Sequence, residues 1–146
     1  MILAGRDVGA FALLVGADYT TLIETLTRCA PPGGISVPVA SAMGVPWPWV
    51  EQMKMHGLPA LLDRLGDSLH PSKHAALVAS LRASGVPVIA TTHSPDLVDC
   101  VTYDEVFVCA GDTVRCLAEH PEAAEWRTLL RTGEFWGTVG EAWVSK

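Results

Sequence analysis

Apolar residues recur most regularly in the second half of the chain. The run from Ala60 to Asp63 is apolar and ends in an acid, and the run from Val86 to Thr92 is β-branched and almost entirely apolar. Both runs predict strands, the second one buried on both faces. Between them, the apolar stripe from Lys73 to Ser84 predicts a helix, which Ser72 can cap and Gly85 can end.

Smaller elements are predicted after these strands. Ser94 and Pro95 supply an N-cap and a first-position proline for a short helix through Val101. A hairpin is predicted next, with strands from Glu105 to Ala110 and from Thr113 to Leu117 and a turn at Gly111-Asp112. Two closing helices are predicted from Pro121 to Arg131 and from Glu134 to Val144.

The first half of the chain is less regular. From Asp7 to Arg28, apolar residues recur at roughly helical spacing, which predicts two short helices or one broken helix. Ile35 to Val39 alternates well enough to predict a short strand. Glycines and prolines interrupt every candidate element over residues 41–59, so we expect an irregular stretch there.

Together these elements predict an α/β fold. Strand, helix, strand and helix follow one another as in a parallel layer, and the hairpin is appended to it. We therefore expect a partial parallel sheet with flanking helices, a C-terminal hairpin and closing helices. The predicted division is a helical and irregular N-terminal segment over 1–59 and a sheet-forming part over 60–146.

Composition narrows the classes of function. The chain has 146 residues, of which 49% are hydrophobic and 18% charged, a globular balance for one domain. The formal net charge is -6 and the basic residues are scattered, so we do not expect direct nucleic-acid binding. The apolar stretch from Val8 to Ala17 is about half of the ~20 residues that a membrane span needs. We expect a cytoplasmic protein that does not bind membranes, and the 4 cysteines contain no CxxC pair that would indicate a metal or disulfide framework.

Two polar residues stand at the ends of predicted strands. Asp63 closes the first strand and His93 follows the second. Because ligands of open α/β sheets bind at the carboxyl ends of strands, both are candidate site residues. A residue in such a place can also do no more than cap the next helix or satisfy a local hydrogen bond.

Longer motifs surround these two residues. They are Leu61-Leu62-Asp63, Ser68-Leu69-His70-Pro71, Val88-Ile89-Ala90-Thr91-Thr92-His93-Ser94-Pro95-Asp96-Leu97, Gly133-Glu134-Phe135-Trp136 and Val139-Gly140-Glu141-Ala142-Trp143. In this order they resemble the C-terminal half of the cassette-type AAA ATPases, a clan with RecF-like, SMC-like and overcoming-lysogenization-type members. The resemblance covers residues 60–146. More weakly, Arg6 to Pro38 is similar to the helical segment that precedes the signature motif in such proteins.

The resemblance implies a role for each motif residue. Asp63 corresponds to the Walker B acid, which holds Mg²⁺ through water, so it is the implied metal residue. His93 corresponds to the switch histidine, which can donate a hydrogen bond to the γ-phosphate of ATP. Asp63 and His93 are thus the implied catalytic and nucleotide-binding residues. His70 lies at the Leu-His-Pro position, where a structural or dimer-facing role is implied.

The chain departs from the family pattern at three points. Arg64 occupies the position of the catalytic carboxylate, and a guanidinium stays protonated and cannot act as a base; Asp67 is a poor substitute for it. The phosphate-binding pattern G-x-x-x-x-G-K-[ST] is absent, and none of the lysines follows a glycine. The stretch 41–44, Ser-Ala-Met-Gly, matches the signature loop only weakly.

We therefore expect a truncated or degenerate ATPase-type domain that does not hydrolyse ATP on its own. ATP and Mg²⁺ would bind only if another chain supplied the phosphate-binding loop, so a homo-oligomer or a partner ATPase or effector chain is expected. The alternative is a non-enzymatic interaction module whose apolar surface is rich in tryptophan, of which the chain has 5. An independent enzyme that pairs His93 with an acid is disfavoured, because no Ser or Cys nucleophile motif accompanies them.

Overall fold

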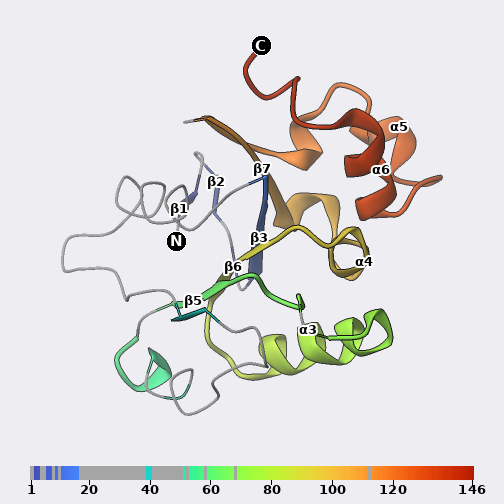
Figure 1. Ribbon diagram of the computed structural model, residues 1–146. Coiled ribbons are helices and arrows are strands. Elements are labelled where there is room, and N and C mark those ends of the chain that lie inside the picture. The colour runs from blue at the N-terminus through green and yellow to red at the C-terminus, as the bar shows by residue number, and fades with distance from the viewer. Residues whose placement is uncertain are drawn as a thin grey trace.

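The fold places helices against one face of a central sheet (Figure 1). The computed structural model describes residues 2–3, 6–7, 9, 11–16, 39–40, 51, 53–57, 59–67, 69–111 and 113–146.

In the described part of the chain, the central sheet has six strands, of which five neighbours run parallel and the last pairs antiparallel at one edge. In spatial order they are β4 (Val39–Ala40), β5 (Ala60–Asp63), β6 (Val88–Thr92), β3 (Phe11–Val15), β7 (Val106–Ala110) and β8 (Thr113–Cys116). A separate antiparallel pair consists of β1 (Ile2–Leu3) and β2 (Arg6–Asp7). The α/β class predicted from the sequence is confirmed.

The helices lie on one side of this sheet, as the positions of α3, α4 and α6 in Figure 1 show. Sheet residues such as Leu62 and Ala90 share one buried cluster with Leu81, Leu97 and Phe135 from these helices. The helical elements are η1 (Pro71–Lys73), α3 (His74–Ala83), α4 (Pro95–Val98), η2 (Tyr103–Glu105), η3 (Leu117–Glu119), α5 (Ala123–Trp126) and α6 (Thr132–Val139).

The other face of the sheet carries a second buried cluster, which includes Leu14, Leu61, Ile89 and Phe107. Alternate residues of each strand therefore enter opposite clusters, as the pleat requires. The central strands are buried on both faces, and this explains why their sequences are continuous apolar runs rather than alternating ones.

The predicted helix from Asp7 to Arg28 is wrong for Phe11–Val15, which form the central strand β3, and for Asp7, which belongs to β2. A short apolar run such as Phe-Ala-Leu-Leu-Val fits a buried helix and a buried strand equally well by periodicity. This run forms a strand because it pairs with β6 on one side and with β7 on the other. Both β3 and β4 come from the first 59 residues, so the sheet draws strands from both sides of the predicted division.

Other predictions for the first half are only partly covered. Val39 begins β4, while the rest of the predicted strand, residues 17–38 and the weak signature match lie outside the described residues. The irregular stretch predicted over 41–59 is wrong at Glu51 and at 53–55, which are helical. Glutamate, methionine and lysine favour helices there despite the neighbouring glycines and prolines.

The elements predicted after residue 59 are confirmed in order and type, but the closing helices are shorter than predicted. Only Ala123–Trp126 is helical in the first, and the second ends at Val139. Gly140 stops α6 because its backbone, at φ 63 and ψ -151, lies in a region that only glycine adopts readily. Trp143 therefore does not continue a helical face from Trp136, and its side chain packs in the main core.

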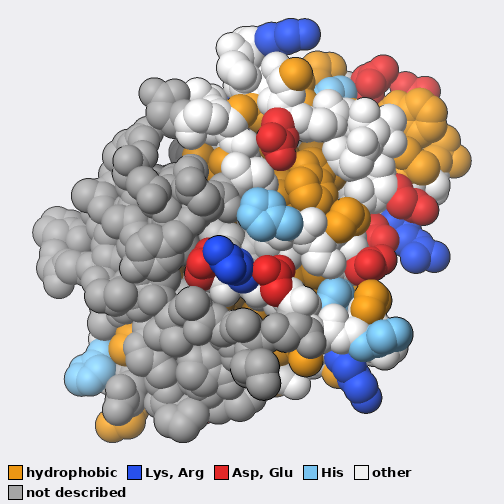
Figure 2. Space-filling view, in the orientation of Figure 1, with side chains coloured by type: hydrophobic (Ala, Val, Ile, Leu, Met, Phe, Trp, Pro, Cys, Tyr) orange, Lys and Arg blue, Asp and Glu red, His pale blue; other side chains and the backbone are white. Residues whose placement is uncertain are grey.

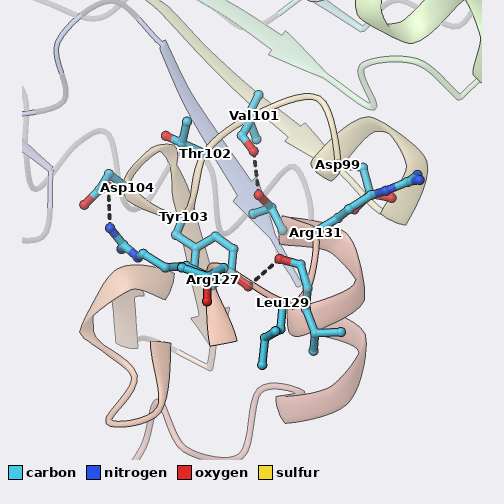
Figure 3. Close-up of a pocket in the computed structure, with 11 residues that line it drawn as sticks. Asp99, Val101, Thr102, Tyr103, Asp104, Arg127, Leu129 and Arg131 are labelled. Carbon is cyan, nitrogen blue, oxygen red and sulfur yellow. Dashed lines mark hydrogen bonds and ion pairs between the residues drawn. The ribbon is translucent and has the colours of Figure 1, made fainter. Parts of the chain in front are cut away.

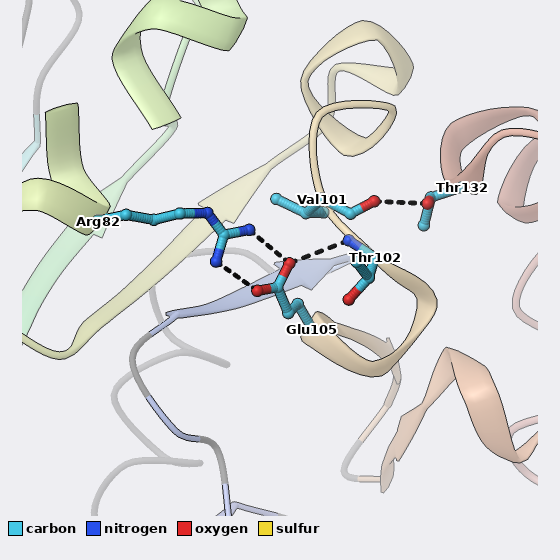
Figure 4. Close-up of polar contacts among 5 residues, drawn as sticks. All are labelled: Arg82, Val101, Thr102, Glu105 and Thr132. Atoms are coloured by element: carbon cyan, nitrogen blue, oxygen red, sulfur yellow. Dashed lines mark hydrogen bonds and ion pairs between the residues drawn. The ribbon is translucent and has the colours of Figure 1, made fainter. Parts of the chain in front are cut away.

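Two side-chain links tie the helices to the segment before β7 (Figure 4). Arg82 of α3 donates hydrogen bonds of 2.5 and 2.7 Å to the two carboxylate oxygens of Glu105, whose Oε2 also accepts from the Thr102 backbone N–H. The Thr132 hydroxyl at the start of α6 donates to the Val101 carbonyl at 2.6 Å. These contacts fix the turn that leads from α4 into β7.

Within the described residues, no helix combines the length and apolar character needed to cross a membrane.

Candidate functional site

The strand register brings the two sequence-predicted residues to the same edge of the sheet. β5 and β6 are adjacent and parallel, and Leu62 pairs with Ala90, so Asp63 stands level with Thr91. His93 follows two residues later, roughly 7 Å further along the strand direction at ~3.3 Å per residue. Asp63 and His93 thus lie at neighbouring carboxyl ends, where ligands of such sheets bind.

This edge also contains the topological switch point of the sheet. The chain leaving β3 goes next to β4, beyond β6 and β5, whereas the chain leaving β6 goes next to β7, on the other side of β3. The adjacent strands β3 and β6 are therefore followed by strands on opposite sides of the pair, and ligands of such sheets bind beyond the carboxyl ends at this point. Val15 pairs with Thr92, so Gly16 continues the register opposite His93.

Asp63 is held by the neighbouring strand. Its side chain is buried, and Oδ1 accepts a hydrogen bond of 2.6 Å from the Thr91 hydroxyl. The Thr91 oxygen in turn accepts from the Arg64 backbone N–H at 2.9 Å. The second carboxylate oxygen of Asp63 lies 4.0 Å from Arg64 Nε, a loose contact with an exposed guanidinium. Thr91, whose role the sequence reasoning missed, therefore orients both Asp63 and the residue after it.

Arg64 has a left-handed backbone, with φ 54, the one such non-glycine residue in the described part of the chain. An arginine in this conformation costs free energy that glycine would not. Unfavourable backbone geometry concentrates at functional sites, and here it falls at the position that the resemblance assigns to the catalytic carboxylate. The Arg64 side chain projects into solvent beside Asp63.

The turn after Arg64 is fixed by buried polar contacts. The Leu65 backbone N–H donates to the Thr91 carbonyl, and the Thr92 hydroxyl donates to the Leu65 carbonyl. His74 Nε2 lies 3.2 Å from the Gly66 carbonyl, which can only accept, so this nitrogen carries the proton. The other ring nitrogen of His74 is buried without a hydrogen-bond partner.

His93 itself is exposed and makes no hydrogen bond or ion pair with another residue of the described part. The helix-capping interpretation of this segment holds for its neighbours, because Ser94 Oγ accepts from the Leu97 N–H and Thr92 Oγ1 accepts from the Ser94 N–H. His93 takes no part in that capping. Its imidazole is thus available to a ligand at this edge of the sheet.

A carboxylate that the sequence reasoning did not assign to the site reaches the same edge from the C-terminal segment. A Cβ placed on Gly16 would lie 2.6 Å from Glu141 Oε1 and 2.7 Å from the Cys109 carbonyl oxygen. Glu141 therefore rests directly against the backbone at the end of β3. Burial, with a smaller contribution from this carboxylate, raises the pKa of Cys109 to about 12.

His70, for which the resemblance implies a structural or dimer-facing role, makes a local contact at the start of η1. Its Nδ1 accepts from the Ser72 backbone N–H at 3.2 Å and lies 2.9 Å from the Ser72 hydroxyl, so His70 caps η1. The predicted cap at Ser72 is wrong, because the N-cap of α3 is Lys73, with no side-chain cap. His70 is exposed and precedes α3.

A separate open cavity of about 560 Å³ lies between the segment before β7 and the α5–α6 connection (Figure 3). Its polar groups are largely engaged with one another. The Tyr103 hydroxyl donates to the Leu130 carbonyl at 2.9 Å, and Arg127 lies over the Tyr103 ring and 3.7 Å from Asp104. Neither Asp63 nor His93 lines this cavity.

The surface view shows histidine, basic and acidic side chains gathered near the middle of this face of the molecule (Figure 2). Within the described ranges, no group of three or more His, Cys, Asp or Glu side chains is arranged to hold a metal ion.

Comparisons with protein-family models, curated proteins and solved structures found no match to this chain.

Proposed function

We propose that this chain is a degenerate ATPase-type domain, related to the cassette-type AAA ATPases, that binds nucleotide phosphate at the carboxyl edge but does not hydrolyse ATP alone. The observation that carries the proposal is the register of three adjacent strand ends. Asp63 stands level with Thr91, and His93 stands opposite Gly16, at the switch point. An acid, an exposed imidazole and a glycine meet where phosphates bind in such sheets.

The position of β3 in the sheet favours a degenerate ATPase-type domain over a truncated one that lacks the strand before the phosphate loop. A loop that cradles phosphates must follow a strand ending beside the acid and the histidine, because all three contact the same phosphates. β3 is the strand in that place. It is followed by Gly16-Ala17-Asp18-Tyr19-Thr20-Thr21, which keeps the first glycine but lacks the Gly-Lys pair.

The residues present fit the phosphate end of a nucleotide better than they fit a metal. His93 is exposed and pairs with no described residue, so it can donate to a phosphate oxygen, and the guanidinium of Arg64 attracts anions. Asp63 would be the residue that holds Mg²⁺. One of its oxygens is committed to Thr91 and the other lies beside Arg64, which weakens its attraction for a cation.

Without the phosphate-loop lysine and the catalytic carboxylate, the chain can bind ATP but cannot hydrolyse it on its own. Arg64 cannot take a proton from water, and nothing in the sequence after Gly16 replaces the lysine. A partner chain of different sequence would have to supply both the cation and the base for turnover. The domain would then contribute binding and His93 to a shared site.

Equilibrium binding of ATP to the purified chain, by calorimetry or ligand-observed NMR, tests the proposal. The sequence alone predicts ATP only in a site completed by another chain. Because β3 lies in the place of the phosphate-loop strand, we instead expect weak, millimolar-range binding by the chain alone that falls several-fold in His93→Ala, with no phosphate release. His56→Ala is the matched control, because His56 is exposed and precedes the amino end of β5, at the opposite edge. Binding that His93→Ala and His56→Ala change equally would reject the site, and no binding at all would favour the interaction-module alternative.

A further inference from the structure

Glu141 occupies the place that a bound phosphate would need at the end of β3. Its Oε1 is 2.6 Å from the position of a Cβ on Gly16, so the carboxylate lies in contact with the glycine backbone. Gly16 stands opposite His93 in the strand register. A phosphate that accepts from His93 while lying over Gly16 would therefore meet the negative charge of Glu141.

The segment that carries Glu141 is firmly anchored. Gly140 turns the chain out of α6 with a backbone conformation specific to glycine, and its N–H still donates to the Trp136 carbonyl at 2.8 Å. On the other side, Trp143 and Val144 are buried, and the Trp143 indole N–H donates to the Gly140 carbonyl at 3.0 Å. The indole also meets the His120 ring edge-on and lies under the Arg115 guanidinium. Glu141 thus lies between two anchored points of the backbone, Gly140 on one side and the buried Trp143 and Val144 on the other.

No described residue acts as a stabilising partner of the carboxylate itself. Its side chain forms no hydrogen bond or ion pair with any residue in the described part of the chain. The residue is exposed, and its carboxylate also lies against a strand end, beside the carbonyl oxygen of Cys109.

We infer that Glu141 is a built-in block of the phosphate site, which repels anionic ligands until the C-terminal segment is displaced or its charge is neutralised. The inference rests on the proposed function, because it concerns regulation of that same edge. A charged partner surface that bound Glu141, or pulled Trp143 from its core position, would open the site. The blocking group and its anchor belong to the same short segment, so one contact could release both.

The test compares Glu141→Gln with the wild type in binding of ATP and of inorganic tripolyphosphate, both measured by calorimetry. Glutamine keeps the shape and removes the charge, so we expect binding of both anions to tighten by about tenfold, from close-range charge repulsion. The gain should shrink as salt rises from about 0.05 to 0.5 M, since salt screens exposed charges. Glu122→Gln is the matched control: Glu122 is exposed at the start of α5, and its loss changes the net charge equally.

The double variant Glu141→Gln with His93→Ala separates this inference from the proposed function. Tighter binding in Glu141→Gln that the double variant loses supports both. Tighter binding that the double variant keeps supports the block but rejects the role of His93. Binding in the wild type that depends on His93, yet is unchanged or weakened by Glu141→Gln, overturns the block and leaves the proposed function standing. No anion binding by any variant overturns both.

Discussion

At the scale of single residues, the carboxyl edge combines an anchored acid with an unfavourable backbone. Thr91 links the two, because its hydroxyl donates to Asp63 and accepts from the N–H of Arg64. The left-handed arginine is thus held by a hydrogen bond from the adjacent strand. Such a conformation persists only where its surroundings impose it.

Replacing Arg64 tests whether its backbone conformation costs stability. Arg64→Gly removes the Cβ that disfavours φ 54 and forfeits only a loose contact with Asp63, so we expect no loss or a gain of up to about 1 kcal/mol in the free energy of unfolding. Arg64→Val, with a β-branched side chain, should lose about 1–2 kcal/mol. Urea unfolding measures both. The idea would be contradicted if Arg64→Gly destabilised the protein as much as Arg64→Val or more.

Thr91→Val should destabilise the site without creating a cavity. Valine preserves the shape but leaves the buried Asp63 oxygen and the Arg64 N–H without their partner, at a cost of about 1–3 kcal/mol. Thr138→Val, on the exposed face of α6, should change stability by less than about 0.5 kcal/mol. Equal, small effects of the two substitutions by chemical denaturation would show that Thr91 does not hold the acid.

At the scale of elements, two close approaches fix the helices on the sheet. α6 crosses α4 so tightly that a Cβ on Gly133 would lie 2.2 Å from the Pro95 carbonyl oxygen. At the same close contact, the Gly133 N–H donates a hydrogen bond of 2.8 Å to the Asp99 carboxylate. The Arg82–Glu105 pair joins α3 to the start of β7.

Gly133→Ala should therefore be strongly destabilising. The added methyl group would clash with the backbone of Pro95, which cannot move away as a flexible side chain could. We therefore expect the free energy of unfolding to fall by about 3 kcal/mol or more. Gly137→Ala in the same helix is the matched control, since nothing lies within 4 Å of its Cβ position and alanine favours helix by about 0.5–1 kcal/mol. Thermal unfolding should shift in opposite directions for the two variants. A mild effect of Gly133→Ala would mean that α4 and α6 are packed more loosely than described.

Acid should weaken the link between α3 and β7. Burial alone would raise the pKa of Glu105, but hydrogen bonds from Arg82 and from the Thr102 N–H outweigh it and hold the pKa below the ordinary 4.5. A lowered carboxyl pKa stabilises the fold above about pH 4.5, and this contribution is lost as the pH falls through the lowered value. Glu105→Gln should thus lower Tm by a few degrees at pH 7 and by progressively less toward pH 3. A Tm difference from wild type that is constant over this range would exclude the charge as its cause.

The sequence predicted the elements after residue 59 better than those before it, for a physical reason. β5, α3, β6 and the hairpin carry their own signals in strand composition, capping and turn residues. β3 has none, because its burial on both faces removes the alternation that marks a strand. The same limit applies to the site: parallel neighbours place Asp63 near His93, whereas the approach of Glu141 to Gly16 depends on how the C-terminal segment folds back.

At the scale of the whole molecule, the order of the strands determines where chemistry can occur. β3 is first among the parallel strands in the sequence yet lies between β6 and β7, so its carboxyl end joins residues from distant parts of the chain. Most large apolar side chains of the described residues pack in the core. Among the described tryptophans, Trp143 is buried and Trp126 and Trp136 pack against the main cluster, while Met55 and Leu129 are the exposed large hydrophobics.

The whole chain should release no phosphate from ATP in the presence of Mg²⁺. Turnover needs a cation on the phosphates and a base for the attacking water, and the loop after β3 and position 64 provide neither. Arg64→Glu restores a carboxylate beside Asp63, but it supplies no lysine, so its phosphate release should also stay at buffer background. Asp63→Asn in each background is the control for contaminating ATPases. Mg²⁺-dependent release by the wild type that Asp63→Asn abolishes would show a complete site, and release by Arg64→Glu alone would show that the missing base, rather than the missing lysine, limits this domain.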